Sequence, residues 1–165
     1  MSTPAKIADH PIHPMLVALP IGMWVFALIG DIVYAAGGNV GWSAAAFYTI
    51  GVGILGALAA AIPGLIDLVS MSPSRARTIG IWHMSINLAL VGLFAVNFFL
   101  RWQTGLSAGT ALVLTIIGIA GLLVSGWLGG EMVYVLGTAV KRETDTSARS
   151  TGRTDIGRGP GREAA

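Results

Sequence analysis

Two of the chain's three histidines stand close together near its start, and a proline follows each of them. His10 and His13 lie in the stretch Asp9-His10-Pro11-Ile12-His13-Pro14, directly before the first long apolar run. The third histidine, His83, lies near the start of another apolar run. Imidazole binds haem iron and divalent metals, and it exchanges protons near neutral pH. The pattern therefore indicates a histidine-centred site if these segments meet in the fold.

Two kinds of cofactor fit these residue types. A b-type haem takes histidines that face a pocket between helices, and His13 and His83 would supply them, with His10 as a substitute. A divalent metal takes two or three imidazoles and a carboxylate, and the candidate ligands are His10, His13, His83 and Glu131. We rank haem b above the divalent metal.

Two further classes of function need no cofactor. A small transporter or proton-conducting protein would use Asp67, His83 and Glu131, with Asp31 as an exit on the opposite side. A structural membrane partner would use none of them, because polar groups near helix ends also cap helices or reach toward headgroups. The sequence contains no phosphate-binding loop and no nucleophile beside a base, so nothing favours an enzyme.

The composition is that of a membrane protein. Of the 165 residues, 54% are hydrophobic and only 11% are charged, whereas soluble domains average about 25% charged residues. The mean hydropathy is +0.74. The chain has no cysteine, which excludes disulfides and thiolate metal sites. Its basic residues lie near the ends of apolar runs and in the C-terminal segment, so we expect the lipid bilayer as a partner and no nucleic acid.

Four apolar runs are long enough to cross a bilayer, which takes roughly 20 residues in a helix. They cover about residues 15–36, 44–69, 79–100 and 107–136. A segment in lipid must satisfy its own backbone hydrogen bonds, so each run is expected to be a helix and no strand is expected. The prediction is an all-α, integral membrane four-helix bundle over residues 1–140. Residues 141–165 are predicted to be a disordered, basic cytoplasmic tail.

The basic residues also predict an orientation. With four spans, the N-terminus, the loop that carries Arg75 and Arg77, and the C-terminus share one side of the membrane. The other side has Arg101 alone. The positive-inside rule then places both termini in the cytoplasm.

Four polar residues from different parts of the bundle are expected at one depth. At ~1.5 Å of rise per residue, the group falls within roughly 10 Å of one membrane level, and its members are His13, Asp67, His83 and Glu131. This shared level predicts one site near the cytoplasmic face. The side chains expected to support its ligands are Asp67, Asn87, Glu131 and Tyr134.

Small residues at helical spacing predict close contacts between helices. One stripe on the second run comprises Gly56, Ala60 and Gly64, and a stripe on the fourth run comprises Gly118, Gly121, Ser125 and Gly129. In lipid, such stripes let helix backbones approach one another. We therefore expect a tight bundle, with a homodimer through these Gly-rich faces as an additional hypothesis.

Motifs in all four runs carry a family resemblance. They are His10-Pro11-Ile12-His13-Pro14 with Leu19-Pro20-Ile21-Gly22, Pro63-Gly64-Leu65-Ile66-Asp67, His83 with Asn87, and Gly126-Trp127-Leu128-Gly129-Gly130-Glu131 with Val133-Tyr134. Together they resemble a bacterial membrane-protein family catalogued as domain of unknown function 2231, over about residues 9–140. The resemblance implies a four-helix protein of the bacterial inner membrane. The histidine pattern is also similar to that of small membrane cytochromes, which implies electron transfer and a redox partner protein by analogy. The chain has Leu136 where a histidine is expected in many members.

Overall fold

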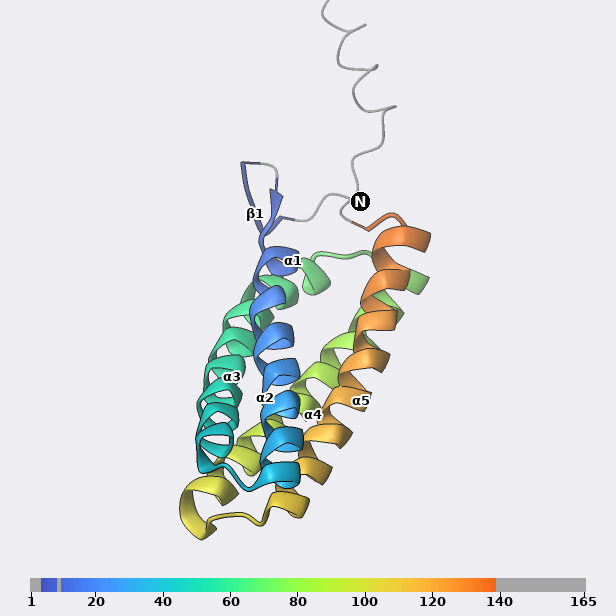
Figure 1. Cartoon of the computed structure of the whole chain (residues 1–165). Coiled ribbons are helices and arrows are strands. Elements are labelled where there is room, and N and C mark those ends of the chain that lie inside the picture. Colours follow the sequence, from blue (N-terminus) through green and yellow to red (C-terminus); the bar gives the residue numbers. More distant parts are fainter. Residues whose placement is uncertain (1–3, 9, 139–165) are drawn as a thin grey trace, which may run out of the picture.

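The chain folds into a bundle of four long helices with a small β-hairpin at one end (Figure 1). The computed structural model describes residues 4–8 and 10–138, so the predicted disordered tail lies outside the described residues. The hairpin pairs β1 (Lys6–Ile7) with β2 (His10–Pro11), and Ala8 turns the chain between them with a φ of 46°. The helices are α1 (Ile12–Leu16), α2 (Ala18–Gly37), α3 (Val40–Val69), α4 (Arg75–Thr104) and α5 (Ala108–Gly130), and α5 continues into the π-helical turn η1 (Glu131–Val135).

The structure has a helix over each of the four predicted apolar runs, with ends that agree to within about one helical turn. The segments long and apolar enough to cross a membrane are Ile12–Gly37, Val40–Val69, Arg75–Thr104 and Ala108–Val135. Three of these helices begin at a polar cap, where Asn39, Ser74 or Ser107 accepts a hydrogen bond from a backbone N–H of the first turn. A cap lets a helix begin in polar sequence before the apolar run starts, which explains why α4 begins earlier than predicted. The two-residue strands of the hairpin correct the expectation that the chain has no strand.

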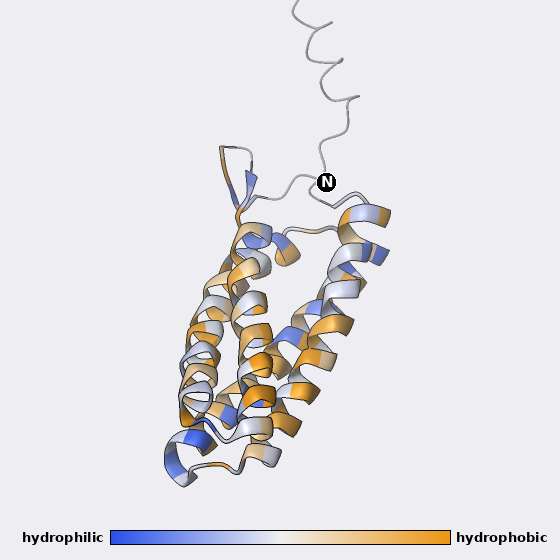
Figure 2. Ribbon diagram, in the orientation of Figure 1, coloured by the Kyte–Doolittle hydropathy of each residue, from blue (hydrophilic) through white to orange (hydrophobic). Residues whose placement is uncertain are grey.

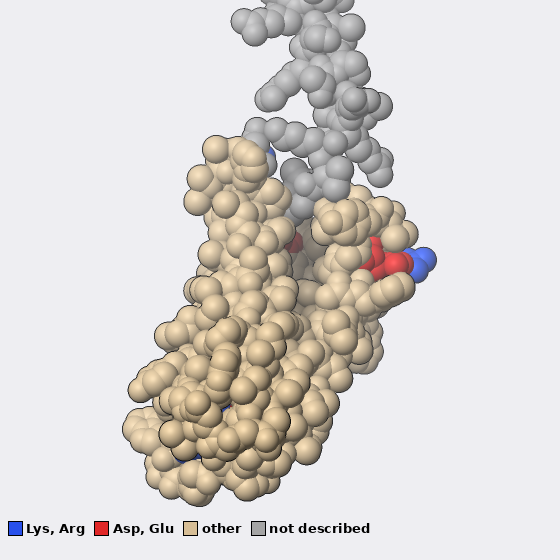
Figure 3. Space-filling view, viewed as in Figure 1, with Lys and Arg blue, Asp and Glu red and all other residues tan. Residues whose placement is uncertain are grey.

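The outer faces of the helices are apolar, as a lipid-facing surface requires. Large exposed side chains include Leu55, Ile62, Leu123 and Trp127. Figure 2 shows apolar residues along the helices and most of the hydrophilic residues toward the two ends. The flank seen in Figure 3 carries almost no charged side chains. The bundle is therefore built to lie in a bilayer.

A proline interrupts the first span near its start. Pro20 has no backbone N–H to donate to Leu16, the fourth residue before it, and its ring crowds that carbonyl group. α1 ends at Leu16, and α2 begins after Val17. In the second span, α3 continues through Pro63. The first break sets the short helix α1, which carries His13, apart from the long helix α2.

Side chains from α1, α2 and α4 meet in pairs along the middle of the bundle. α2 and α4 each pack against both α3 and α5, so they lie diagonally opposite one another. Asp31 forms an ion pair with Arg101, which lies 70 residues later in the sequence. The same offset separates the partners of two other facing pairs, which are Trp24 with Phe94 and His13 with His83. The first and third spans therefore run parallel and in register.

Glycines of α3 and α5 make room for these central rings. A Cβ on Gly53 would collide with the Trp24 indole, and a Cβ on Gly118 would collide with the Phe94 ring. Gly53 and Gly118 are separated by 65 residues (118 minus 53), and they play the same role in the two halves of the chain. The helix pair α2 and α3 is thus related to the helix pair α4 and α5 by an approximate two-fold rotation.

The predicted stripes of small residues serve contacts inside this chain. Gly56 faces Leu19 and Pro20, and Gly121 faces Leu90. The expectation of a tight bundle is confirmed for these helices. The faces are occupied by the chain's own side chains, so they lend no support to a homodimer through them.

The end of the bundle away from the β-hairpin is closed by a buried ion pair. Arg101 donates from Nη1 to Asp31 Oδ1 at 2.8 Å and from Nη2 to Asp31 Oδ2 at 2.6 Å. Thr115 also donates to Asp31 Oδ2, and Asn97 Oδ1 accepts from Arg101 Nε. The side chains of Arg101 and Asp31 are 6% and 0% exposed. Because lipid offers no hydrogen bonds to a charge, each of these groups depends on the others.

We expect Asp31→Asn to lower the free energy of unfolding by about 3–5 kcal/mol, because it leaves the buried Arg101 charge without its partner. The matched control is Glu131→Gln, which removes the ion pair to Arg75, whose side chain is 73% exposed. That change should cost about 0–1 kcal/mol. Unfolding in mixed detergent micelles, followed by circular dichroism, measures both. Equal losses for the two variants would contradict a structural role for the buried pair.

Candidate functional site

A cavity opens at the end of the bundle where the β-hairpin, α1 and η1 lie. Its volume is about 100 Å³, and its walls come from β2, α1, α3, α4 and η1 and the segments that follow α3 and η1. The polar side chains on its walls are His13, Asp67, His83 and Thr138. Figure 3 shows the surface hollowed at this end of the molecule. Both interior histidines thus reach one cavity.

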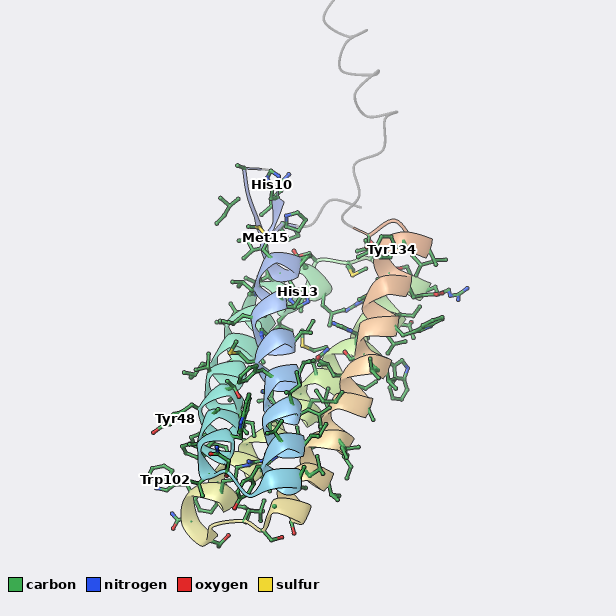
Figure 4. All side chains as sticks on the ribbon, viewed as in Figure 1. His10, His13, Met15, Tyr48, Trp102 and Tyr134 are labelled. Atoms are coloured by element: carbon green, nitrogen blue, oxygen red, sulfur yellow. The ribbon has the colours of Figure 1, made fainter. Side chains whose placement is uncertain are left out.

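His13 is held against α3 by its ring. Its Nδ1 lies 2.8 Å from the carbonyl oxygen of Ala60, and Figure 4 shows the side chain beside α1, close to the bundle interior. Gly64 lies behind the ring, where a Cβ would approach His13 Nδ1 to 2.8 Å. The absence of a side chain at Gly64 on α3 therefore provides a shallow seat for this imidazole.

His83 is held against α5 in the same way. Its Nδ1 lies 2.9 Å from the carbonyl oxygen of Ser125 and 3.1 Å from the Ser125 hydroxyl. Gly129 lies behind the ring, with a Cβ position 3.3 Å from His83 Cε1. Asn87 donates to Ser125 Oγ at 2.6 Å and to the His83 carbonyl at 2.8 Å. In both halves, an imidazole bonds a carbonyl and rests on the glycine that follows one helical turn later.

The carbonyl partners determine which nitrogen of each imidazole ring carries the proton. A carbonyl oxygen can only accept, so Nδ1 carries the proton in His13 and in His83. In the neutral ring, Nε2 then has a free lone pair, and within residues 4–8 and 10–138 it makes no hydrogen bond. The two ring centroids are 6.2 Å apart, and the ring planes are perpendicular. A backbone bond at one nitrogen is the usual way to orient a histidine that binds a metal through the other.

The other predicted site residues are distributed unevenly. Asp67 lines the cavity, and its Oδ1 accepts a hydrogen bond from the Ala5 N–H at 3.0 Å. His10 lies in the hairpin, where its Nδ1 is 2.8 Å from the Ala8 carbonyl oxygen. Tyr134 is 90% exposed on the outside of η1 (Figure 4). Glu131 pairs with Arg75 and does not line the cavity.

The predicted four-ligand metal group is not assembled. Among residues 4–8 and 10–138, no three His, Asp or Glu side chains are arranged to hold a metal. The prediction placed these groups by depth alone, and depth does not say which way a side chain points around its helix. The change to π-helical winding begins at Glu131, and the Glu131 carboxylate reaches outward to Arg75.

The cavity does not fit a haem. Small-molecule sites occupy about 300–1,000 Å³, whereas this cavity has about 100 Å³. The ring centroids of His13 and His83 are 6.2 Å apart. This separation leaves room for a single ion, because a metal–nitrogen bond is about 2.0–2.1 Å long and starts at the edge of the ring.

Several features of the site were missed by the sequence analysis. Three of the cavity's apolar residues are the methionines Met71, Met84 and Met132. Thr138 also lines it, with a buried hydroxyl that has no hydrogen-bond partner among the described residues. An internal comparison of the two halves at an offset of 70 residues, the offset of Asp31 and Arg101, would have paired His13 with His83. The methionines carried no comparable signal, because they look like ordinary apolar residues of a span.

The comparison with known families agrees with this architecture. The family model DUF2231, described as a predicted membrane protein, matches residues 9–142. The chain belongs to this family. No curated protein and no solved structure matches it. The DUF2231 match begins just before the two His-Pro pairs and includes all four spans, so both imidazoles of the cavity lie within the family domain.

We expect Gly64→Ala to lower the free energy of unfolding by about 1–3 kcal/mol, because the added methyl group would push the His13 ring off its carbonyl partner. The control is Gly126→Ala, where a Cβ would meet nothing within 4 Å. That change should be neutral or stabilising by about 0.5–1 kcal/mol, since alanine favours a helix. Denaturant titration in detergent measures both, and a change in the His13 Nδ1–H resonance should accompany the first. An unchanged resonance in Gly64→Ala would show that the ring does not rest there.

Proposed function

We propose that this membrane protein binds one transition-metal ion between His13 and His83. The observation that carries the proposal is the matched fixing of two imidazoles on one cavity, each through an Nδ1–H bond to the backbone of a neighbouring helix. Two free Nε2 lone pairs favour an electron-poor occupant and disfavour an anion. Imidazole is a preferred ligand for zinc, copper, nickel and iron.

The lining also argues against a hard cation. Calcium takes six to eight oxygen ligands, and magnesium requires a near-octahedral oxygen shell. Asp67 is the acidic residue on the cavity wall, and its Oδ1 is occupied by the Ala5 N–H. A Thr138 hydroxyl adds one oxygen. Too few oxygen atoms are therefore at hand for either ion.

The alternative of a proton or ion pathway has less support. It required Glu131, whose carboxylate is paired with Arg75 outside the cavity. Asp31, the exit considered for this pathway, is bonded to Arg101 and Thr115. The stacked rings of Trp24 and Phe94, 4.1 Å apart, fill the interior between the two ends. Haem b, electron transfer and a redox partner protein stay predictions from the sequence, with the small cavity weighing against haem.

We also propose that the cavity opens toward the cytoplasm at the inner membrane of a bacterium. The β-hairpin, the α3–α4 connection and the end of η1 lie at the same end of the bundle (Figure 1). This end carries Lys6, Arg75 and Arg77. Arg101, the one basic residue counted for the opposite side, is neutralised by Asp31. Three basic residues at this end against one at the other support an orientation with both termini inside.

The purified full-length protein should bind one equivalent of a transition-metal ion, with Zn²⁺ as the first probe. His13→Ala and His83→Ala should each abolish tight binding, because a single imidazole cannot hold the ion alone. His10→Ala is the matched control and should bind like the parent, since His10 lies in the hairpin. Isothermal titration in detergent and metal analysis after dialysis measure the stoichiometry. Zn²⁺ binding that survives both interior substitutions would refute the proposed site.

The orientation is testable because the chain has no cysteine. Ser72→Cys lies in the α3–α4 connection, and Gln103→Cys lies near the end of α4, where both native side chains are exposed. A membrane-impermeant maleimide should label Gln103→Cys in intact spheroplasts and should label Ser72→Cys only in inverted vesicles. The reverse labelling pattern would place the cavity on the outer side of the membrane.

A further inference from the structure

We infer that the ion is monovalent copper, Cu(I), held by the two imidazoles together with thioether sulfur from the methionines on the cavity wall. The inference rests on the proposed function and adds the identity of the metal and a second class of ligand. The methionines are Met71, Met84 and Met132, and all three line the cavity shared by His13 and His83.

The methionines converge on this cavity from separate parts of the chain. The sequence has six methionines, and half of them line this one small space. Met71 follows α3, Met84 directly follows His83 on α4, and Met132 lies in η1. The sulfur of Met132 lies 3.4 Å from the place where a Cβ on Gly80 would stand, and Gly80 is itself part of the cavity wall. Leu68 Cδ1 lies 2.8 Å from the same place, so the missing side chain at Gly80 lets both Leu68 and the Met132 sulfur approach α4.

The donor set discriminates among metals. Soft thioether ligands select Cu(I), imidazole accepts several first-row metals, and carboxylate and carbonyl oxygen favour hard ions. This cavity presents imidazole and thioether groups on a wall that is otherwise largely apolar. An apolar wall disfavours a hydrated dication more than a monovalent ion, because the cost of desolvation rises with charge. The chain has no cysteine, so sulfur can reach the ion only from methionine.

The proposed cytoplasmic opening is consistent with the monovalent state. Glutathione and thioredoxin keep the cytosol reducing, so copper that enters from that side arrives as Cu(I). No electron transfer at the site is needed, and binding consists of exchange between the ion's carrier and the side chains of the cavity.

The test compares Cu(I) with Zn²⁺ on the full-length protein in detergent, without oxygen. Cu(I) affinity is measured by competition with the chromophoric chelator bicinchoninate, and Zn²⁺ affinity is measured by titration. The variant is the triple substitution Met71→Leu, Met84→Leu and Met132→Leu, which nearly conserves side-chain volume. Met15→Leu is the control, because Met15 is exposed and absent from the cavity wall.

Removing a group that only hydrogen-bonds to a metal ligand lowers metal affinity by about tenfold or more. The triple variant loses ligands themselves, so its Cu(I) affinity should fall by more than about tenfold. Its Zn²⁺ affinity should stay near that of the parent, because the imidazoles remain. X-ray absorption at the copper edge should show sulfur neighbours in the parent and in Met15→Leu, and only nitrogen neighbours in the triple variant. Retained Zn²⁺ binding also shows that the triple variant is folded.

Four results would overturn the inference. Equal Cu(I) affinity in the parent and the triple variant would mean that sulfur is not a ligand, while the two-histidine site would stand. Zn²⁺ binding without Cu(I) binding would have the same meaning. A parent protein that binds neither ion would remove both this inference and the proposed function. If the triple variant loses Zn²⁺ as well, each single Met→Leu variant is measured, and three unchanged Cu(I) affinities would count against sulfur ligation.

Discussion

Large side chains from the first and third spans fill the middle of the bundle, and glycines on α3 and α5 let them fit. No hydrophobic force drives helices together in lipid, so close packing must hold the bundle. Trp24 stacks on Phe94 between Gly53 and Gly118, and this contact sets the spacing of all four helices. The same arrangement continues toward the β-hairpin, where the two rings are imidazoles and the glycines are Gly64 and Gly129. The candidate site is thus one layer of the packing scheme that holds the protein together.

The approximate two-fold relation between the halves has opposite consequences at the two ends. At one end the equivalent positions hold Asp31 and Arg101, whose charges and hydrogen bonds satisfy each other. At the other end they hold His13 and His83, which present the same kind of lone pair. Two identical acceptors cannot bond to each other. The first end is closed by its own chemistry, whereas the second needs a proton donor or a cation from outside.

Backbone features on the neighbouring helices prepare that second end. Each histidine bonds a carbonyl one helical turn before a glycine, so the Nδ1 edge of the ring is held against the helix, and Nε2 makes no hydrogen bond within the described part of the chain. Asn87 ties the hydroxyl of Ser125 to the backbone of His83. A ligand held through such contacts keeps its orientation when no ion is bound, and this preorganisation favours binding. The π-helical turn at Glu131 follows directly, and such turns often occur at functional sites.

The sequence by itself determined the number of spans, their limits to within about one turn and the family, because apolar length and local motifs are properties of contiguous residues. It also indicated that His13 and His83 lie at one depth, since depth follows from position along a span. Only the tertiary structure decided which groups face one another. Rotation about each helix axis depends on packing against the other helices, and this rotation turns Glu131 and Tyr134 away from the cavity and brings Met132 into its wall. Arg101 shows the same limit of sequence-based prediction. It was counted as a loop charge, but in the structure it is a buried partner of Asp31, because the first and third spans lie side by side.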